Sequence, residues 1–82
     1  MEDQPIHVKV RLFSYLKEYA GSPDGIVRVD LAKGAQVKDI FHSLGIENID
    51  VALIMINQNR AKLEDIVSDG DFVEAFPAVG GG

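Results

Sequence analysis

The chain has 82 residues, of which 46% are apolar, and this length allows one small domain with a single core. It contains no cysteine, which excludes disulfides, thiolate metal sites and a cysteine nucleophile. The net charge of −5 argues against nucleic-acid binding, which requires a basic surface, and is compatible with docking onto a basic protein surface.

Two segments near the start alternate between apolar and polar residues. Residues 6–13 do so with His7, Lys9 and Arg11 on the polar face, and residues 26–31 follow the same period. Period two is typical of half-buried strands, so we expect two strands that pair in an antiparallel manner.

The connection between these strands predicts a short helix or a single loose turn. Ser14 is placed to cap it, Tyr15, Leu16 and Tyr19 have helical spacing, and Gly21 is a plausible stop. The Ser-Pro-Asp-Gly stretch that follows is strong turn chemistry.

Residues 36–45 predict the main helix. Apolar residues recur at positions i, i+3, i+4 and i+7, which makes one buried stripe, and Gly45 is well placed to end the helix. The beginning of the helix lacks a Ser, Thr or Asp cap, so this boundary is poorly defined by the sequence. The buried stripe consists of Val37, Ile40, Phe41 and Leu44.

The second half predicts further strands. Residues 51–56 are continuously apolar, which favours a strand buried on both faces in the middle of a sheet. One short strand is expected in the loop that follows, and residues 72–76 form the last strand, which Pro77 ends because proline cannot donate to a ladder.

This order of elements predicts an α+β domain of the β-grasp, or ubiquitin-like, class. We expect a mixed sheet of four to five strands with one main helix packed on one face, because the right-handed crossover rule places the helix there. The domain is expected to cover residues 1–77, and residues 78–82 form a flexible C-terminal tail.

Few residues of the domain suggest chemistry. The only histidines, His7 and His42, are far apart in sequence, and Asp69 and Asp71 flank Gly70 in what reads as a tight turn, so no metal site is expected. We also expect no catalysis by the chain alone, no membrane association and a cytoplasmic location, since no apolar run approaches a membrane span.

The tail is the remaining candidate. Glycine has no Cβ, so Gly81 and Gly82 could enter a channel too narrow for any side chain, and residues 78–82 could extend about 16 Å. The carboxylate of Gly82 would be the reactive group once ATP activates it. The alternative is a tail without a function.

The terminal stretch VSDGDFVEAFPAVGGG resembles the motif that ends members of the MoaD/ThiS family of sulfur carriers, and most closely its MoaD branch. Positions that fall on the motif are Asp69, Gly70, Asp71, Val73, Pro77, Val79, Gly81 and Gly82; Ala78 stands where a second proline is usual. The stretches VKVRLFSYLKEYAG and MINQ also resemble the family, and the likeness spans almost the whole chain.

The resemblance implies a function in molybdopterin, or molybdenum cofactor, biosynthesis. Gly82 would be adenylated by a ubiquitin-activating-type (MoeB/ThiF-like) enzyme that uses ATP, and a sulfur donor would convert the adenylate to a thiocarboxylate. The chain would then be the small, sulfur-donating subunit of a synthase, and its tail would insert into a large (MoaE-like) subunit. Gly81 and Gly82 would carry the reaction, Val79 and Gly80 would line the path of the tail, and Phe76, Pro77 and Ala78 would anchor it.

The exposed face of the sheet around Arg11 is a candidate docking face, with a solvated polar face as the simpler interpretation. Other functions also remain open: a sulfur carrier for thiamine thiazole, tungsten cofactor or amino-acid synthesis, a ubiquitin-like protein modifier, or an interaction module with an incidental tail.

Overall fold

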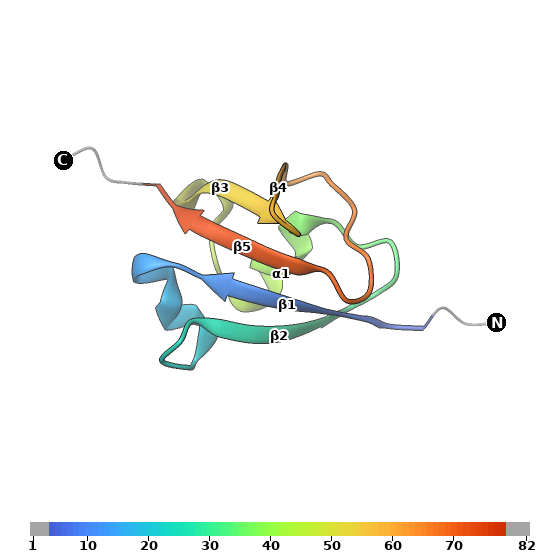
Figure 1. Ribbon diagram of the computed structural model, residues 1–82, viewed down its shortest axis with the longest axis horizontal. Helices are drawn as coiled ribbons and strands as arrows, with labels where there is room; N and C mark the ends of the chain where they lie inside the picture. The colour runs from blue at the N-terminus through green and yellow to red at the C-terminus, as the bar shows by residue number, and fades with distance from the viewer. Residues whose placement is uncertain (1–3, 79–82) are drawn as a thin grey trace.

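Five strands form one sheet in the order β2-β1-β5-β3-β4 in this computed structural model, which describes residues 4–78 (Figure 1). β1 and β5, the first and last strands in the chain, pair in parallel, and the other neighbours pair in antiparallel. The strands are β1 (Ile6–Leu12), β2 (Ile26–Leu31), β3 (Val51–Ile56), β4 (Asn59–Ala61) and β5 (Phe72–Pro77).

One α-helix, α1 (Val37–Leu44), crosses a single face of this sheet (Figure 1). Val37, Ile40 and Phe41 are fully buried against the inward side chains of β1 and β5, and burial of each large side chain stabilises the fold by about 1.5–3 kcal/mol. The predicted α+β class, with a mixed sheet and one main helix, is confirmed. The buried core comprises Ile6, Val8, Val10, Leu12, Leu16, Val29, Val37, Ile40, Phe41, Ile46, Ile54, Val67, Val73 and Ala75.

Both ends of α1 have a clear physical cause. Gly45 ends the helix with a positive φ of 80°, as predicted. At the other end the Gln36 backbone N–H donates to Asp39 Oδ2 at 2.8 Å, which is half of a capping box that the sequence pattern did not reveal.

The prediction for residues 51–56 is wrong in one respect. β3 is not buried on both faces, because only Ile54 is buried, Ala52 is exposed and the remaining side chains are half-buried. β3 has α1 on one side of the sheet only, and its outer neighbour β4 is three residues long. A continuous apolar run therefore marks here a strand with one face in the core and an apolar face turned outward.

The segment after β1 forms a 3₁₀ helix, η1 (Ser14–Ala20), rather than an α-helix. Ser14 does not cap it: Phe13 is the N-cap residue, and Ser14 itself has a left-handed backbone with φ of 56°. Leu16 is the side chain that η1 buries, and Gly21 ends the element with φ of 71°, as expected. A second short 3₁₀ helix, η2 (Asn48–Asp50), precedes β3. Within residues 4–78 no helix is long and apolar enough to cross a membrane.

Candidate docking face and tail root

α1 covers one face of the sheet (Figure 1). The opposite face carries the outward side chains of all five strands. Strand register defines which residues adjoin on it: Arg11 lies beside Glu74, and Glu74 beside Met55. We call this surface the open face. Its residues in the strands are His7, Lys9, Arg11, Ile26, Arg28, Asp30, Leu53, Met55, Arg60, Phe72, Glu74 and Phe76.

An apolar cluster lies on the open face where β5 ends. The rings of Phe13 and Phe76 stack at a centroid distance of 4.2 Å and an interplanar angle of 13°, and Leu53 pairs with Phe76 in the neighbouring strand. These three side chains are half-buried rather than buried. Stacked aromatic rings contribute about 0.5–1.5 kcal/mol beyond their buried area, so the cluster is both a structural contact and a partly exposed apolar surface.

Arg11 joins this cluster from the polar side. Its guanidinium carbon lies 5.0 Å from the centroid of the Phe13 ring, a cation–π distance. The predicted partner-binding residues Arg11 and Phe76 thus both contact one residue, Phe13, that the sequence analysis did not assign to the site.

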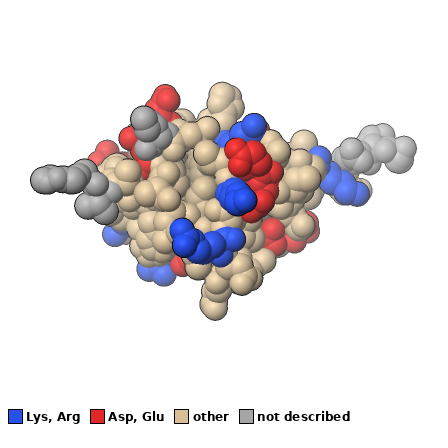
Figure 2. Space-filling view, turned by 90° about the horizontal axis from the view of Figure 1, so that it is seen from above, with Lys and Arg blue, Asp and Glu red and all other residues tan. Residues whose placement is uncertain are grey.

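The open face is locally basic although the whole chain is acidic. Its strand residues include four cations, Lys9, Arg11, Arg28 and Arg60, and two carboxylates, Asp30 and Glu74. Half of the eight Lys and Arg residues of the chain therefore lie on this face. Figure 2, which looks onto the β3–β4 edge, shows basic and acidic groups side by side, so that edge has no field of a single sign.

One ion pair occupies the end of the open face farthest from the aromatic cluster. His7 Nδ1 lies 2.6 Å from Asp30 Oδ1, and Arg28 Nε lies 3.3 Å from the same oxygen. The hydrogen bond with His7, with a smaller effect of Arg28, holds the pKa of the Asp30 carboxyl below its usual value. These groups are exposed, so the ion pair adds little to stability.

The last described residues are tied to the body of the domain on both sides. Pro77 pairs with Val51, and the Ala78 N–H donates to the carbonyl of Asp50 at 3.0 Å. On the other side the Tyr15 hydroxyl donates to the Ala78 carbonyl, also at 3.0 Å. Ala78, which the sequence analysis assigned to the tail, is thus hydrogen-bonded to the domain, and we call residues 76–78 the tail root.

The four remaining predicted site residues, Val79, Gly80, Gly81 and Gly82, lie outside the described residues. The structure brings Arg11, Phe76, Pro77 and Ala78 to one end of the sheet. β5 is the element that positions the tail root, because it is the central strand and pairs with β1 on one side and β3 on the other.

The turn that leads into β5 uses its carboxylates for backbone hydrogen bonds. Asp69 Oδ1 accepts from the His7 N–H and Asp71 Oδ2 from the Ser68 N–H, both at 2.8 Å. Gly70 has φ of 87° between them. Both aspartates therefore fix the start of β5, and the turn interpretation of this motif accounts for their positions.

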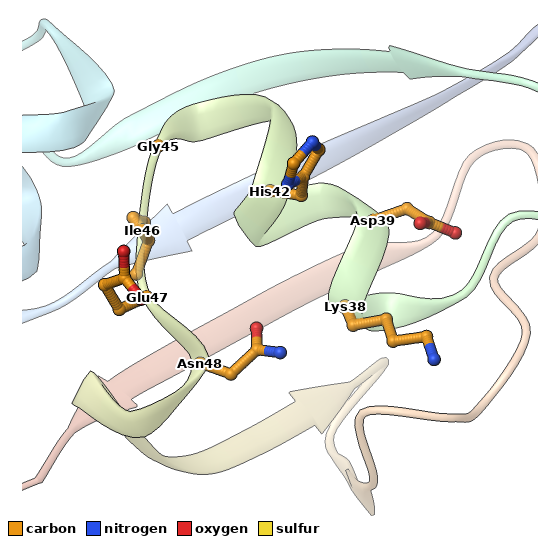
Figure 3. Close-up of a pocket in the computed structure, with 7 residues that line it drawn as sticks. All are labelled: Lys38, Asp39, His42, Gly45, Ile46, Glu47 and Asn48. Atoms are coloured by element: carbon orange, nitrogen blue, oxygen red, sulfur yellow. The ribbon is translucent and has the colours of Figure 1, made fainter.

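A hollow of about 580 Å³ lies on the other side of the molecule, between α1 and the segment before η2 (Figure 3). Its side chains carry both signs of charge, and in Figure 3 they spread outward rather than converge on one point. Within residues 4–78 no three His, Asp or Glu side chains come close enough to hold a metal ion. The residues that line the hollow are Lys38, Asp39, His42, Gly45, Ile46, Glu47 and Asn48.

Sequence reasoning missed three residues of the tail root and its surroundings. Phe13 could have been found from the alternation of β1. It follows His7, Lys9 and Arg11 on the polar face, and an aromatic residue in such a row of polar side chains indicates a contact. Tyr15 and Asp50 gave no such signal, since their contacts with Ala78 span 63 and 28 positions of the chain.

Comparisons with known proteins fit this arrangement. The family model described as "ThiS family" matches residues 10–82, which include most of the open face and the terminal glycines. The solved small archaeal modifier protein 1 of Haloferax volcanii is 30% identical and superposes with a TM-score of 0.74 over 90% of this chain and 99% of its own.

Two further structures have the same fold. The small archaeal modifier protein 1 of Methanosarcina acetivorans is 27% identical, with a TM-score of 0.66 over 96% of this chain and 99% of its own. A Pyrococcus furiosus protein, provisionally named molybdopterin converting factor subunit 1, is 23% identical, with a TM-score of 0.71 over 90% and 99% of the two chains. The family match across almost the whole chain, together with the β-grasp fold, shows that this chain belongs to the ThiS family.

Proposed function

We propose that the chain is a sulfur carrier whose Gly82 carboxylate is converted to a thiocarboxylate. The observation that carries the proposal is the family match, which extends through Gly81 and Gly82. Support comes from the tail root, because a central strand and two hydrogen bonds hold the chain firmly up to Ala78. A rigid base with a narrow, side-chain-free end suits insertion into the active site of another protein.

The chemistry requires activation of a poor acyl donor. The Gly82 carboxylate attacks the α-phosphate of ATP, pyrophosphate leaves, and an acyl-adenylate forms on a ubiquitin-activating-type adenylyltransferase of the MoeB/ThiF kind. Sulfide (HS⁻) from a sulfur donor then attacks the acyl carbon, AMP leaves, and the thiocarboxylate forms. The chain supplies the carboxylate and binds no ATP itself, and its role is that of a co-substrate or small subunit rather than of an enzyme.

The open face is the surface we propose for docking. Its apolar cluster, formed by Phe13, Phe76 and Leu53, lies beside the tail root, so a partner that covers the cluster also receives the tail. The cations around the cluster favour an acidic partner surface, which is the opposite of what the net charge of the chain suggested. In molybdopterin synthesis the receiving protein would be a large, MoaE-like synthase subunit.

The proposed acceptor of the sulfur is a pterin precursor, as the MoaD-like fold of the Pyrococcus protein suggests. Thiamine thiazole, tungsten cofactor and amino-acid synthesis need the same carrier chemistry with a different receiving enzyme. Copurification of the chain, with its C-terminus untagged, identifies that enzyme: a large synthase subunit supports the molybdopterin pathway, and a thiazole synthase supports the thiamine pathway.

A second function is favoured by the likeness to the Haloferax volcanii modifier protein. In that case Gly82 forms an isopeptide bond with lysines of other proteins after the same adenylation step. The two functions differ in the nucleophile that displaces AMP, and so in the product.

Intact-mass measurement tests the sulfur-carrier proposal. After incubation with ATP, the activating enzyme and a sulfur source, the mass should rise by the difference between sulfur and oxygen. Deletion of Gly82, or addition of one residue after it, should abolish the change and leave the thermal unfolding midpoint unaltered. Addition of one residue before Met1 is the matched control and should leave the reaction intact.

The outcomes separate the alternatives. No mass change, under conditions in which a known carrier reacts, would contradict the sulfur-carrier function. Isopeptide adducts on cellular proteins without a thiocarboxylate would support the modifier function in its place. Partner binding that survives deletion of residues 79–82, together with no adenylation, would leave only an interaction module.

A further inference from the structure

Ala78 lies one residue beyond β5, yet both of its backbone polar groups are hydrogen-bonded. Its N–H donates to Asp50, at the end of η2, and its carbonyl accepts from Tyr15, in η1. η1 follows β1 and η2 precedes β3, so the two bonds reach Ala78 from the two sides of β5. The Asp50 bond continues the β3–β5 pairing, whereas the Tyr15 bond is made by a side chain.

Burial does not distinguish Tyr15 from the other tyrosine of η1. Tyr15 is 48% exposed and Tyr19 is 43% exposed, so about half of each residue is open to solvent. Of the two tyrosines, both within the described residues, only Tyr15 uses its hydroxyl in a hydrogen bond. This polar contact with the tail root is therefore what distinguishes Tyr15 from Tyr19.

The local backbone directs Tyr15 toward β5. Ser14 has φ of 56°, a left-handed conformation that costs energy in a residue with a Cβ, and it turns the chain immediately before Tyr15. The Phe13 N–H donates to the Ala75 carbonyl at 3.2 Å, and the Phe13 ring stacks on Phe76. Three contacts therefore run in order from this turn onto the last strand, and the Tyr15 contact is the outermost.

We propose that Tyr15 is a positioning residue for the reaction at Gly82, and the inference rests on the proposed function. Its hydroxyl fixes the peptide plane between Ala78 and Val79, and this plane sets the direction in which the last four residues leave the domain. Four extended residues reach at most about 14 Å, so a turn of the plane by about 20° moves the end by about 5 Å. Reacting groups tolerate misplacement of only about 1 Å, so restriction at the base reduces the search for a productive position.

The contact is a single exposed hydrogen bond, and its effect should be correspondingly small. Loss of such a bond changes an equilibrium by about 2- to 12-fold. The Tyr15 hydrogen bond restricts the tail root before the tail enters the partner. Loss of this bond should therefore weaken the binding of the carrier to the activating enzyme rather than slow the chemical step.

The variant Tyr15→Phe tests this role, because it keeps the ring and removes only the hydroxyl. Tyr19→Phe makes the same chemical change on the same element and is the control. With the activating enzyme and ATP, Tyr15→Phe should raise KM for the carrier about 2- to 12-fold and change kcat less than about 2-fold. Tyr19→Phe should change neither constant.

A spectroscopic measurement examines the hydrogen bond without any enzyme. The ¹³C chemical shift of the Ala78 carbonyl should move in Tyr15→Phe and stay constant in Tyr19→Phe. Thermal unfolding of both variants shows whether the folded state is retained.

Each outcome decides between the role in positioning and its alternatives. A carbonyl shift or a KM that equals the wild-type value overturns the inference and leaves the sulfur-carrier function standing. A lower unfolding temperature with unchanged KM assigns Tyr15 to stability alone and also overturns it. Failure of the wild-type chain to be adenylated removes the proposed function and the inference together.

Discussion

At the scale of single residues, Gly25 has the strictest steric requirement among the glycines within residues 4–78. A Cβ at this position would lie 2.4 Å from the Leu12 carbonyl oxygen and 2.9 Å from Lys17 Cγ. The reason is the hydrogen bond from the Leu12 N–H to the Gly25 carbonyl at 2.8 Å, which brings the start of β2 against the end of β1. Gly25 thus holds in place the junction from which Phe13 and Tyr15 reach the tail root.

The variant Gly25→Ala should lower the free energy of unfolding by more than about 3 kcal/mol, because strain in the backbone and a clash with another backbone act together. Gly21→Ala is the matched control: φ is 71° there against 75° at Gly25, and a Cβ at Gly21 would meet nothing within 4 Å. It should cost only about 1–2 kcal/mol. Urea unfolding measures both values, and equal losses would show that the close approach at Gly25 carries no cost of its own.

At the scale of elements, α1 begins without a Ser, Thr or Asp cap because a loop distant in sequence accepts hydrogen bonds from its first N–H groups. The N–H groups of Val37 and Lys38 donate to the carbonyls of Asp65 and Leu63, at 2.9 and 3.0 Å. The first turn of a helix otherwise leaves such donors without partners. The Asp39 carboxylate adds a local contribution, through its bond with the Gln36 N–H.

Removal of the Asp39 carboxylate should lower the stability of the domain measurably. Asp39→Ala should reduce the free energy of unfolding by about 0.5–2 kcal/mol, as loss of a capping carboxylate does in other helices. Lys38→Ala removes an exposed side chain and keeps the backbone N–H that donates to Leu63, so it should change stability by less than about 0.5 kcal/mol. Chemical denaturation compares the two variants. If both behave alike, the loop carbonyls alone are sufficient to start the helix.

At the scale of the whole molecule, charge is distributed unevenly between the two faces. The net charge of −5 makes long-range repulsion from an acidic partner the simple expectation. The open face nevertheless gathers half of the basic residues, with Arg11 against the aromatic cluster. Since screening limits charge interactions to about 8–10 Å at physiological salt, we expect the charges of the open face, rather than the net charge, to govern the proposed docking.

The variant Arg11→Glu should therefore slow association with the activating enzyme roughly 3- to 10-fold at low salt, and the difference should shrink as salt is raised. Lys38→Glu makes the same charge change on α1, on the opposite side of the sheet, and should have little effect. Stopped-flow or surface-binding kinetics give the rates. Equal slowing by both variants would show that net charge, and not the open face, controls the encounter.

The sequence by itself determined the elements that local patterns specify. The alternation of β1 and β2, the apolar stripe of α1 and the glycines that end η1 and α1 all follow from period and turn chemistry, and the structure confirms them. The terminal glycines were likewise evident from the sequence alone, and Gly81 and Gly82 lie outside the described residues.

Only the tertiary structure decided which faces remain open and what holds the tail root. The apolar run of β3 does not indicate which side of the strand α1 covers. Only the arrangement of the sheet shows that one apolar side of β3 faces outward. The contacts of Tyr15 and Asp50 with Ala78 likewise depend on strands far apart in the chain being brought together. Local patterns carry information about neighbours in sequence, whereas the position of the tail root depends on a parallel pairing between the first strand and the last.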